Sequence, residues 1–318
     1  MSIETMNSTT AVPLGLSPVL IALRTCFVAI IAVLIICGNI LVVAVTRRVT
    51  NLADSTKVLM TSLAVYDLLV GVSAVLISAI ASALDRWPFG EAGCYFYAIV
   101  MTVAVSMSTL SVTCLNIERY IAVTRPFKFP LWCTRRRAIT LVVVASIACL
   151  SCAPLPKILL ATSPYYYEGS LLCFYSNTSI YLNIFFLLSC NVFPTLLMSC
   201  IYYHLVKISR DHEQRLNRNG NNEANNNRDN KALKTFLVVT LTFVGCFFPF
   251  TLVRVGESLT GELSPNWLQF LSAWLGTSNS MFNVWIYCLF NSSFRERAKT
   301  IISERFPCCN RSVAPAVA

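Results

Sequence analysis

Five polar side chains interrupt apolar stretches of the sequence, at places where a polar group is costly. A carboxylate in such surroundings takes up a proton, accepts hydrogen bonds or attracts a cation. Asp67, with hydroxyl and amide neighbours, is therefore a candidate site for Na⁺ or a water cluster. A network that only holds helices together is the other interpretation, and the residues alone leave both open. The set is Asn39, Asp67, Ser108, Asn279 and Asn283.

A charged group ends another apolar stretch, where Glu118 and Arg119 stand side by side and Tyr120 follows. Opposite charges joined by hydrogen bonds attract each other strongly. The simplest interpretation is an ion pair that anchors a helix end at a membrane surface.

The elements that carry these groups are apolar blocks long enough to cross a bilayer. The chain has 318 residues, of which 56% are hydrophobic and 13% charged, whereas a soluble domain carries about a quarter charged residues. A helix of ~20 apolar residues spans a membrane, and residues 1–18 are too polar for a cleavable signal peptide. We expect an all-α membrane protein, a seven-transmembrane helix bundle with spans over residues 20–46, 55–82, 93–124, 136–158, 178–206, 230–257 and 265–290.

The basic residues give the expected orientation. Most of the 25 Lys and Arg follow spans one, three and five or lie in the C-terminal tail, and such residues favour the cytoplasmic side. We expect an extracellular N-terminus over residues 1–19, a membrane domain over 20–290 in the plasma membrane, and a cytoplasmic segment over 291–318. The net charge of +10 thus reflects topology and attraction to anionic lipid, and it indicates no nucleic-acid partner.

An Asn-rich stretch separates spans five and six. Residues 217–230 are nearly devoid of apolar side chains and cannot bury enough surface to fold. The sequence therefore predicts a disordered cytoplasmic loop over about residues 210–229.

Most of the 14 cysteines lie inside apolar stretches and are expected to be packing residues. Cys94 begins span three on the outer side, and Cys173 lies in the loop between spans four and five. Both face an oxidising compartment, so we expect a disulfide between them, with two unpaired thiols as the alternative. Cys308 and Cys309 end a basic stretch near the membrane and are candidates for palmitoylation.

Two short features complete the residue-level analysis. Asn7 and Asn177 match the glycosylation acceptor pattern on the expected outer side. Pro194 and Pro249 lie deep inside spans five and six, where each removes a backbone hydrogen bond and kinks its helix. The kinks are either static or points of movement.

Several motifs, taken together and in this order, resemble the class A, rhodopsin-like family of G protein-coupled receptors. The six motifs fall in or beside spans one, two, three, six and seven, so the resemblance covers essentially the whole chain. The motifs are GN at 38–39, SLAVYDLLVG at 62–71, RWPFGEAGC at 86–94, ERY at 118–120, CFFPF at 246–250 and NVWIY at 283–287.

The resemblance implies a conformational switch that signals to a heterotrimeric G protein. In it, Glu118 and Asp229 would hold Arg119, and activation would turn Arg119 toward Tyr202 and Tyr287. The residues expected to transmit the movement are Phe243, Phe247, Pro249 and Pro194. The resemblance further implies an amphipathic helix from Phe294 along the inner leaflet, and arrestin and a receptor kinase as partners.

Three positions depart from the family pattern. Val284 replaces a proline, Phe247 replaces a tryptophan, and span four lacks its usual tryptophan. We expect these changes to shift the resting balance of the switch without removing it.

The resemblance also bears on the ligand. Thr277 stands where light receptors have their retinal-binding lysine, so we expect no retinal and no other cofactor apart from Na⁺. Met101 stands where amine receptors have an aspartate, which argues against a standard amine site. Arg254 either receives an acidic group of the extracellular ligand or pairs with an acidic residue of the chain. The expected pocket comprises Met101, Thr102, Val105, Phe186, Cys190, Phe250, Thr251, Arg254 and Thr277.

Other classes of protein explain the sequence less well. A channel or transporter would place charges along a path through the membrane, and Asp67 is the only acidic residue well inside a span. The sequence contains no HExxH or GxSxG motif, so we expect no enzyme. A receptor that is active without ligand remains an alternative, because the aromatic segment 165–175 would fill its own pocket.

Overall fold

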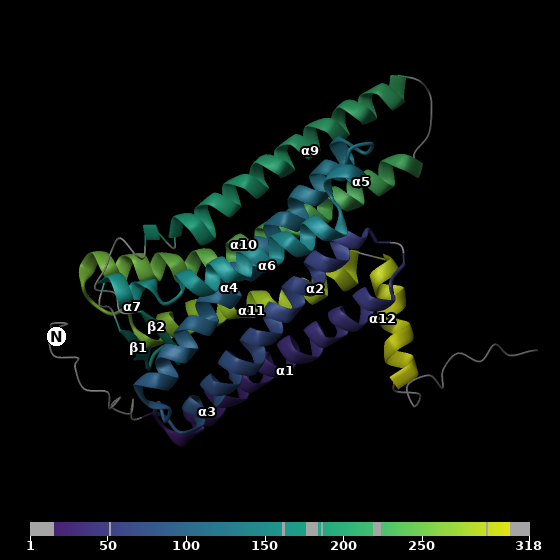
Figure 1. The fold of residues 1–318 in the computed structure, drawn as a ribbon. Coiled ribbons are helices and arrows are strands. Elements are labelled where there is room, and N and C mark those ends of the chain that lie inside the picture. The colour runs from purple at the N-terminus through teal and green to yellow at the C-terminus, as the bar shows by residue number, and fades with distance from the viewer. Residues whose placement is uncertain are drawn as a thin grey trace, which may run out of the picture.

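A computed structural model shows a bundle of long helices that run side by side (Figure 1). A β-hairpin lies at one end of the bundle and α12 crosses the other end, and we call these the hairpin end and the α12 end. The structure describes residues 16–50, 52–160, 163–175, 184–185, 187–218, 224–290 and 292–305.

The long helices follow the expected spans closely. Five segments in the described part are long and apolar enough to cross a membrane: Pro18–Arg48, Asp54–Ala83, Gly90–Thr124, Arg135–Ile158 and Val238–Thr260. The helices that form the bundle are α1 (Pro18–Arg48), α2 (Asp54–Leu69) with its continuation α3 (Leu76–Ala83), α4 (Gly90–Thr124), α6 (Arg135–Cys152), α9 (Phe193–Arg218), α10 (Ala224–Thr260) and α11 (Asn266–Phe290). The expected helical membrane bundle is confirmed.

Shorter elements connect the long helices and close the two ends. The wide π-helical turns η2 (Val70–Val75) and η3 (Leu187–Val192) join α2 to α3 and precede α9. The other short elements are α5 (Phe129–Trp132), α7 (Leu155–Leu160), α12 (Ser292–Arg305), β1 (Pro164–Tyr167) and β2 (Leu172–Tyr175).

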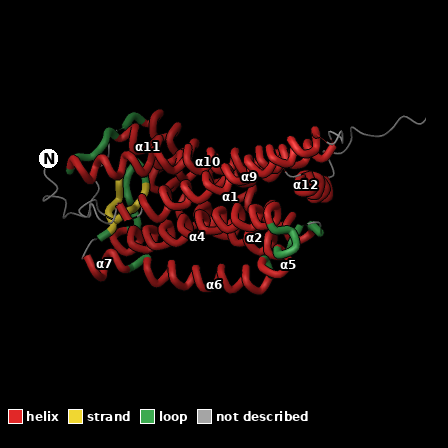
Figure 2. The backbone as a smooth tube through the Cα atoms, turned by 90° about the horizontal axis from the view of Figure 1, so that it is seen from above, coloured by secondary structure: helices red, strands yellow, loops and turns green. Residues whose placement is uncertain are grey.

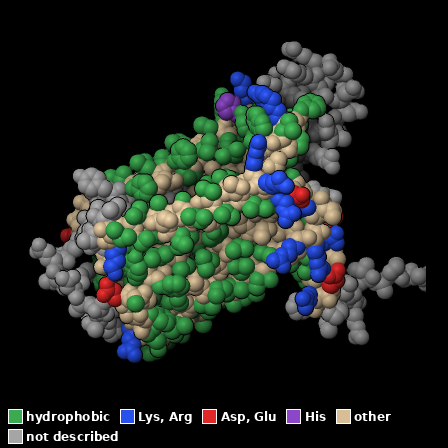
Figure 3. Space-filling model, viewed as in Figure 1, with side chains coloured by type: hydrophobic (Ala, Val, Ile, Leu, Met, Phe, Trp, Pro, Cys, Tyr) green, Lys and Arg blue, Asp and Glu red, His purple; other side chains and the backbone are tan. Residues whose placement is uncertain are grey.

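The surface explains why the helices need a membrane. Apolar side chains cover the flank of the bundle, while Lys and Arg gather toward the α12 end (Figure 3). α6 lies along the outside of the bundle (Figure 2), and Ala138 is the only buried residue of this helix. Water would not tolerate such a flank, whereas lipid chains would cover it.

Both prolines lie where the helical geometry changes. Pro249 lies inside α10, and Pro194 is the second residue of α9, directly after η3. A proline cannot donate the backbone hydrogen bond that continues an α-helix, and a π-turn is one way to accommodate the gap.

The region between α9 and α10 differs from the expected loop. α9 continues to Arg218 and α10 begins at Ala224, so helix reaches into the expected disordered segment, residues 210–229, from both sides. Glu, Gln and Arg in the extension of α9 are residue types that favour helix, whereas the Asn-rich start of α10 has no such preference.

Gly38 brings α1 close to α11. A Cβ atom at Gly38 would lie 3.0 Å from Cγ2 of Val284, and Val284 is the residue that replaces the expected proline of span seven. The glycine therefore makes room for a branched side chain on the facing helix.

The α12 end is closed by contacts between the last helix and the first. Phe294 of α12 is completely buried, and its ring lies 5.8 Å from the ring of Tyr287. Arg48, the last residue of α1, forms a 2.6 Å ion pair with Glu304. α12 thus packs on the bundle through Phe294, Ala298 and Ile301, which are buried in one cluster with residues of α1 and α11.

Candidate functional site

A cavity of about 190 Å³ opens inside the bundle beneath the hairpin. Its walls come from α4, α10 and α11, and β2 covers it. Of the expected pocket residues, Phe186 and the side chain of Cys190 lie outside the described part of the chain. The structure brings the others together on the cavity wall: Met101, Thr102, Val105, Phe250, Thr251, Arg254 and Thr277.

The cavity wall also includes residues outside the expected pocket set. Phe174, which belongs to the aromatic segment 165–175, lines it from above, with its ring 5.3 Å from that of Phe250. Ser280 and Ser108 line it as well, next to the buried Asp67. The sequence indicated that aromatic side chains of this segment turn inward, but not which of them reaches the cavity.

The hairpin is attached to three elements of the bundle. The expected disulfide joins Cys173 to Cys94 of α4, with their Cα atoms 5.4 Å apart. Ser78 of α3 donates a 2.9 Å hydrogen bond to the carbonyl of Leu171. Trp274 of α11 donates a 3.0 Å hydrogen bond to the carbonyl of Ser170. The hairpin therefore forms a fixed cover over the cavity.

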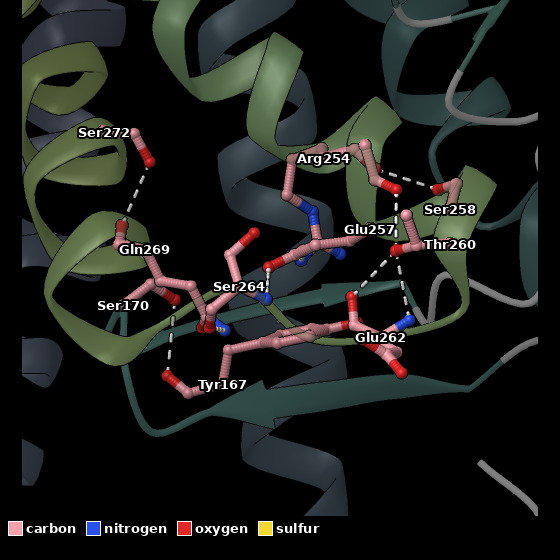
Figure 4. A network of polar contacts seen from close by, with 11 residues as sticks. Tyr167, Ser170, Arg254, Glu257, Ser258, Thr260, Glu262, Ser264, Gln269 and Ser272 are labelled. Carbon is pink, nitrogen blue, oxygen red and sulfur yellow. Dashed lines mark hydrogen bonds and ion pairs between the residues drawn. The ribbon is translucent and has the colours of Figure 1, made fainter. Parts of the chain in front are cut away.

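Arg254 of α10 connects this cover to a buried acidic residue (Figure 4). Its Nη1 lies 2.7 Å from Oε2 of Glu257, and Oε1 of Glu257 accepts a hydrogen bond from the backbone of Ser264. The guanidinium lies 4.3 Å from the ring centre of Tyr167 and 5.3 Å from that of Phe174. Of the two roles considered for Arg254, the structure shows pairing within the chain.

Glu168, in the turn of the hairpin, has a raised pKa. Burial raises the pKa of Glu168 above its ordinary value, and the negative charge of Asp85 adds to this. Burial also raises the pKa of the nearby Tyr166, against the opposing effect of Arg24. The hairpin surface thus favours neutral side chains.

Asp67 is completely buried and accepts three hydrogen bonds. Oδ1 accepts from Ser280 at 2.8 Å and from Ser108 at 3.1 Å, and Oδ2 accepts from Asn283 at 3.1 Å. Asn39 joins this group by donating to the carbonyl of Ser280 at 3.0 Å. The structure places four of the five expected residues in one hydrogen-bonded group.

Asn279, the fifth, is buried but forms no hydrogen bond with Asp67, whereas the neighbouring Ser280 does. Successive residues of an α-helix point about 100° apart, so only one of the two faces the carboxylate. In the described residues no cluster of three or more His, Cys, Asp or Glu gathers for a metal. A Na⁺ site here therefore depends on Asp67 and neutral oxygen atoms.

An aromatic series leads from the cavity toward the α12 end. Phe247 lines the cavity, and its ring lies 5.0 Å from that of Phe243. Phe243 is buried in a cluster with Leu63, Val112 and Met198. Pro249 lies two residues from Phe247, at the level of the cavity. These expected transmission residues connect the cavity to the centre of the bundle.

The expected pair of Glu118 and Arg119 is not formed. Oε1 of Glu118 accepts a hydrogen bond from Ser55 of α2, and Oε2 is buried without a partner among the described residues. Arg119 is only partly buried and forms no ion pair with its neighbour. Because adjacent helical residues point in different directions, Glu118 faces α2 and Arg119 does not.

The tyrosines expected in the switch pack at the same end. Tyr120 and Tyr202 pack around Ile201 and Leu205 of α9. Tyr287 packs with Phe294 and with the cluster that contains Phe243. The side chain of Asp229 lies outside the described part of the chain, and so do Asn7, Asn177, Cys308 and Cys309.

Comparison with known proteins identifies this architecture. The family described as 7 transmembrane receptor (rhodopsin family) matches residues 38–287. The chain is 30% identical to the histamine H2 receptor of Homo sapiens over 285 residues, covering 85% of this chain and 77% of that receptor. It is 26% identical to trace amine-associated receptor 6 of Pan troglodytes over 294 residues, covering 86% and 83%. It is 28% identical to the thyrotropin-releasing hormone receptor of Bos taurus over 313 residues, covering 86% and 78%.

The chain belongs to the rhodopsin family of seven-transmembrane receptors. It is a multi-pass protein of the plasma membrane that signals through G proteins, and it is not an enzyme. The expected class of receptor is thereby confirmed.

Proposed function

We propose that the chain is a receptor for a small extracellular molecule that binds in the cavity beneath the hairpin. The observation that carries this proposal is the cavity itself, about 190 Å³ in volume and covered by the disulfide-bonded hairpin. Sites for drug-sized ligands measure roughly 300–1,000 Å³, so this cavity suits a smaller molecule. Two relatives, named for histamine and trace amines, are consistent with a small ligand.

The ligand acts by changing the position of α10. It contacts Phe247 and Phe250 on either side of Pro249, where the helix is weakened. Movement of α10 at that point shifts Phe243 within its cluster and opens the α12 end around Arg119. The hairpin end faces the outside together with the N-terminus, and the α12 end faces the G protein, arrestin, a receptor kinase and the inner leaflet.

Modification and ion binding complete the proposal. Asn7 and Asn177 carry sugars, and Cys308 and Cys309 carry palmitate. The oxygen atoms of Asp67, Ser108 and Ser280 fit Na⁺, since hard cations prefer oxygen ligands.

Bound Na⁺ would place a positive charge beside Asp67, whose side chain joins α2 to α4 and α11. Thermal unfolding in NaCl and in choline chloride tests the ion site. A gain in stability that is specific to Na⁺ and lost in Asp67→Asn supports it. Equal stability in both salts contradicts it.

The test of the receptor function is signalling in cells at matched surface levels. G protein dissociation, cAMP and calcium are measured for the native chain and for Arg119→Ala, first without ligand and then with a small-molecule panel. A signal that Arg119→Ala abolishes supports the switch. A signal of unchanged size in Arg119→Ala contradicts it.

A second candidate is a receptor that is active without any ligand. The observation in its favour is Phe174, which the chain itself places in the cavity against Phe250. In that case the native chain signals fully before the panel is added, and no compound raises the signal further.

A further inference from the structure

Most hydroxyl groups of the cavity wall already donate their protons within the protein. Thr102 of α4, Thr251 of α10 and Thr277 of α11 all line the cavity. Each donates to the carbonyl four residues earlier in its helix, at 2.8, 2.9 and 3.0 Å. A hydroxyl has one proton and two lone pairs, so each threonine retains only acceptor capacity toward the cavity.

The two serines next to Asp67 also donate their hydroxyl protons within the protein. Ser108 and Ser280 both donate to Asp67, which leaves their lone pairs for other groups. Five hydroxyl groups on the wall therefore present acceptors, while Ser106 and the guanidinium of Arg254 are the donors among the described lining side chains. A ligand with donor groups gains hydrogen bonds at several points of this wall, whereas a ligand with only acceptors finds few partners.

Charge restricts the ligand further. Arg254 is the charged residue among the described residues that line the cavity, and its charge is balanced by Glu257, which is 2% exposed. An acidic ligand would compete with Glu257 for this guanidinium, and displacement of Glu257 would leave its carboxylate buried without its ion pair, which is strongly unfavourable. The existing pair thus disfavours anions.

A cationic ligand is also disfavoured. The position expected for an amine-binding aspartate holds Met101, and the described wall offers no carboxylate to the cavity. Asp67 lies behind Ser108 and Ser280 and already accepts three hydrogen bonds. Burial of an unpaired ammonium group in apolar surroundings is costly.

We propose that the cavity binds a small, uncharged molecule with an apolar body and one or more hydrogen-bond donors. This inference rests on the proposed function, because it specifies the ligand of that site. The apolar body lies against Phe174, Phe247 and Phe250, and the donors reach the hydroxyl oxygens of Thr102, Thr251 or Thr277. Phenols, indoles and primary amides have this chemistry.

The test uses the purified full-length receptor in detergent, so it does not depend on G protein. Thermal unfolding is measured with four probes that share one indole ring. They are indole-3-ethanol, its derivative methylated on both the oxygen and the ring nitrogen, tryptamine and indole-3-acetate. A parallel phenol series is built in the same way. The neutral donor is expected to stabilise the receptor most, and removal of its donors to weaken binding about three- to tenfold per hydrogen bond.

Matched variants assign the effect to the cavity. Thr→Val keeps the shape of a threonine and removes its oxygen, so T102V, T251V and T277V are each compared with T113V. Thr113 makes the same backbone hydrogen bond, at 2.8 Å, but does not line the cavity. Weaker binding of the neutral donors in at least one of the three cavity variants, but not in T113V, is expected.

Three results would overturn the inference. The first is that tryptamine or indole-3-acetate binds more tightly than indole-3-ethanol. The second is that the methylated probe binds as tightly as indole-3-ethanol. The third is that none of the three cavity variants weakens binding in either series. If the receptor signals in cells but fails this binding test, the proposed ligand class is contradicted and the proposed receptor function still stands.

Discussion

The ring of Phe174 in β2 lies 5.3 Å from the ring of Phe250 in α10, one residue beyond Pro249. The cover of the cavity thus touches the helix that has to move. Phe174 stands where part of a bound molecule would stand, so its removal separates a receptor that needs a ligand from one that supplies its own.

Phe174→Ala is expected to lower the ligand-independent signal if the hairpin acts as a built-in ligand. The substitution enlarges the cavity and removes the contact with Phe250. G protein dissociation at matched surface level measures the effect, with Phe96→Ala as control because Phe96 is 55% exposed on the flank. An undiminished signal would rule out activation by the hairpin.

Arg254→Gln is expected to destabilise the receptor by about 3–5 kcal/mol, because it leaves the buried Glu257 unpaired. Arg254→Gln combined with Glu257→Gln should recover much of this loss. Thermal unfolding in detergent gives the comparison. Arg48→Gln is the control, since the pair with Glu304 is about half exposed and contributes less than about 1 kcal/mol. Additive losses in the double variant would show that the pair is not coupled.

Ser55→Ala is expected to raise basal signalling. It removes the hydrogen bond to Glu118, whose other oxygen is already without a described partner, at a cost of about 1–3 kcal/mol to the resting contact of α2 with α4. Ser62→Ala is a control on the same pair of helices, because Ser62 bonds only another hydroxyl, that of Ser111. Equal basal signals in the native chain and Ser55→Ala would show that this bond does not restrain the switch.

Gly38→Ala is expected to lower the unfolding temperature, since the added methyl group would lie 3.0 Å from Val284. Val284→Ala frees the space, so the double variant should be more stable than Gly38→Ala alone. Thermal unfolding of all three variants measures the coupling. Failure of Val284→Ala to compensate would mean that α1 and α11 are held apart by other contacts.

Stability is expected to fall as pH rises from the ordinary carboxyl pKa of 4.5, because the pKa of Glu168 is raised in the folded state. In this window the folded hairpin binds more protons than the unfolded chain, so added protons stabilise the fold. Unfolding temperatures between pH 4.5 and 7 measure the slope. Glu168→Gln should reduce the slope, and an unchanged slope would assign it to other groups.

The apolar spans and the disulfide partners were predictable because apolar length and cysteine position depend on the local sequence, whereas the extensions of α9 and α10 into the polar segment between them were not. The direction in which each side chain points around its helix axis was not predictable. Glu118 and Arg119 are neighbours in sequence, yet only Glu118 faces α2, and the same difference separates Ser280 from Asn279. The direction of each side chain depends on how whole helices pack, and no short motif contains that information.

The cavity was predictable in most of its wall, and its cover only as far as the aromatic segment 165–175 that reaches into it. Thr102, Thr251 and Thr277 follow from the family's arrangement of helices, whereas Phe174 depends on how the hairpin folds after its disulfide forms. The acceptor of each hydroxyl proton also depends on the packed structure and could not be predicted from the sequence.

The hairpin is joined to its neighbours by two different kinds of contact. A disulfide and hydrogen bonds join it to α3, α4 and α11, whereas tilted aromatic rings in contact and a guanidinium over a ring join it to α10. Directional bonds have to break before their partners slide, but groups in van der Waals contact slide while they remain in contact. We therefore expect α10 to move past the hairpin more easily than α3, α4 or α11, and the lifetime of the signal to follow how long a molecule stays in the cavity.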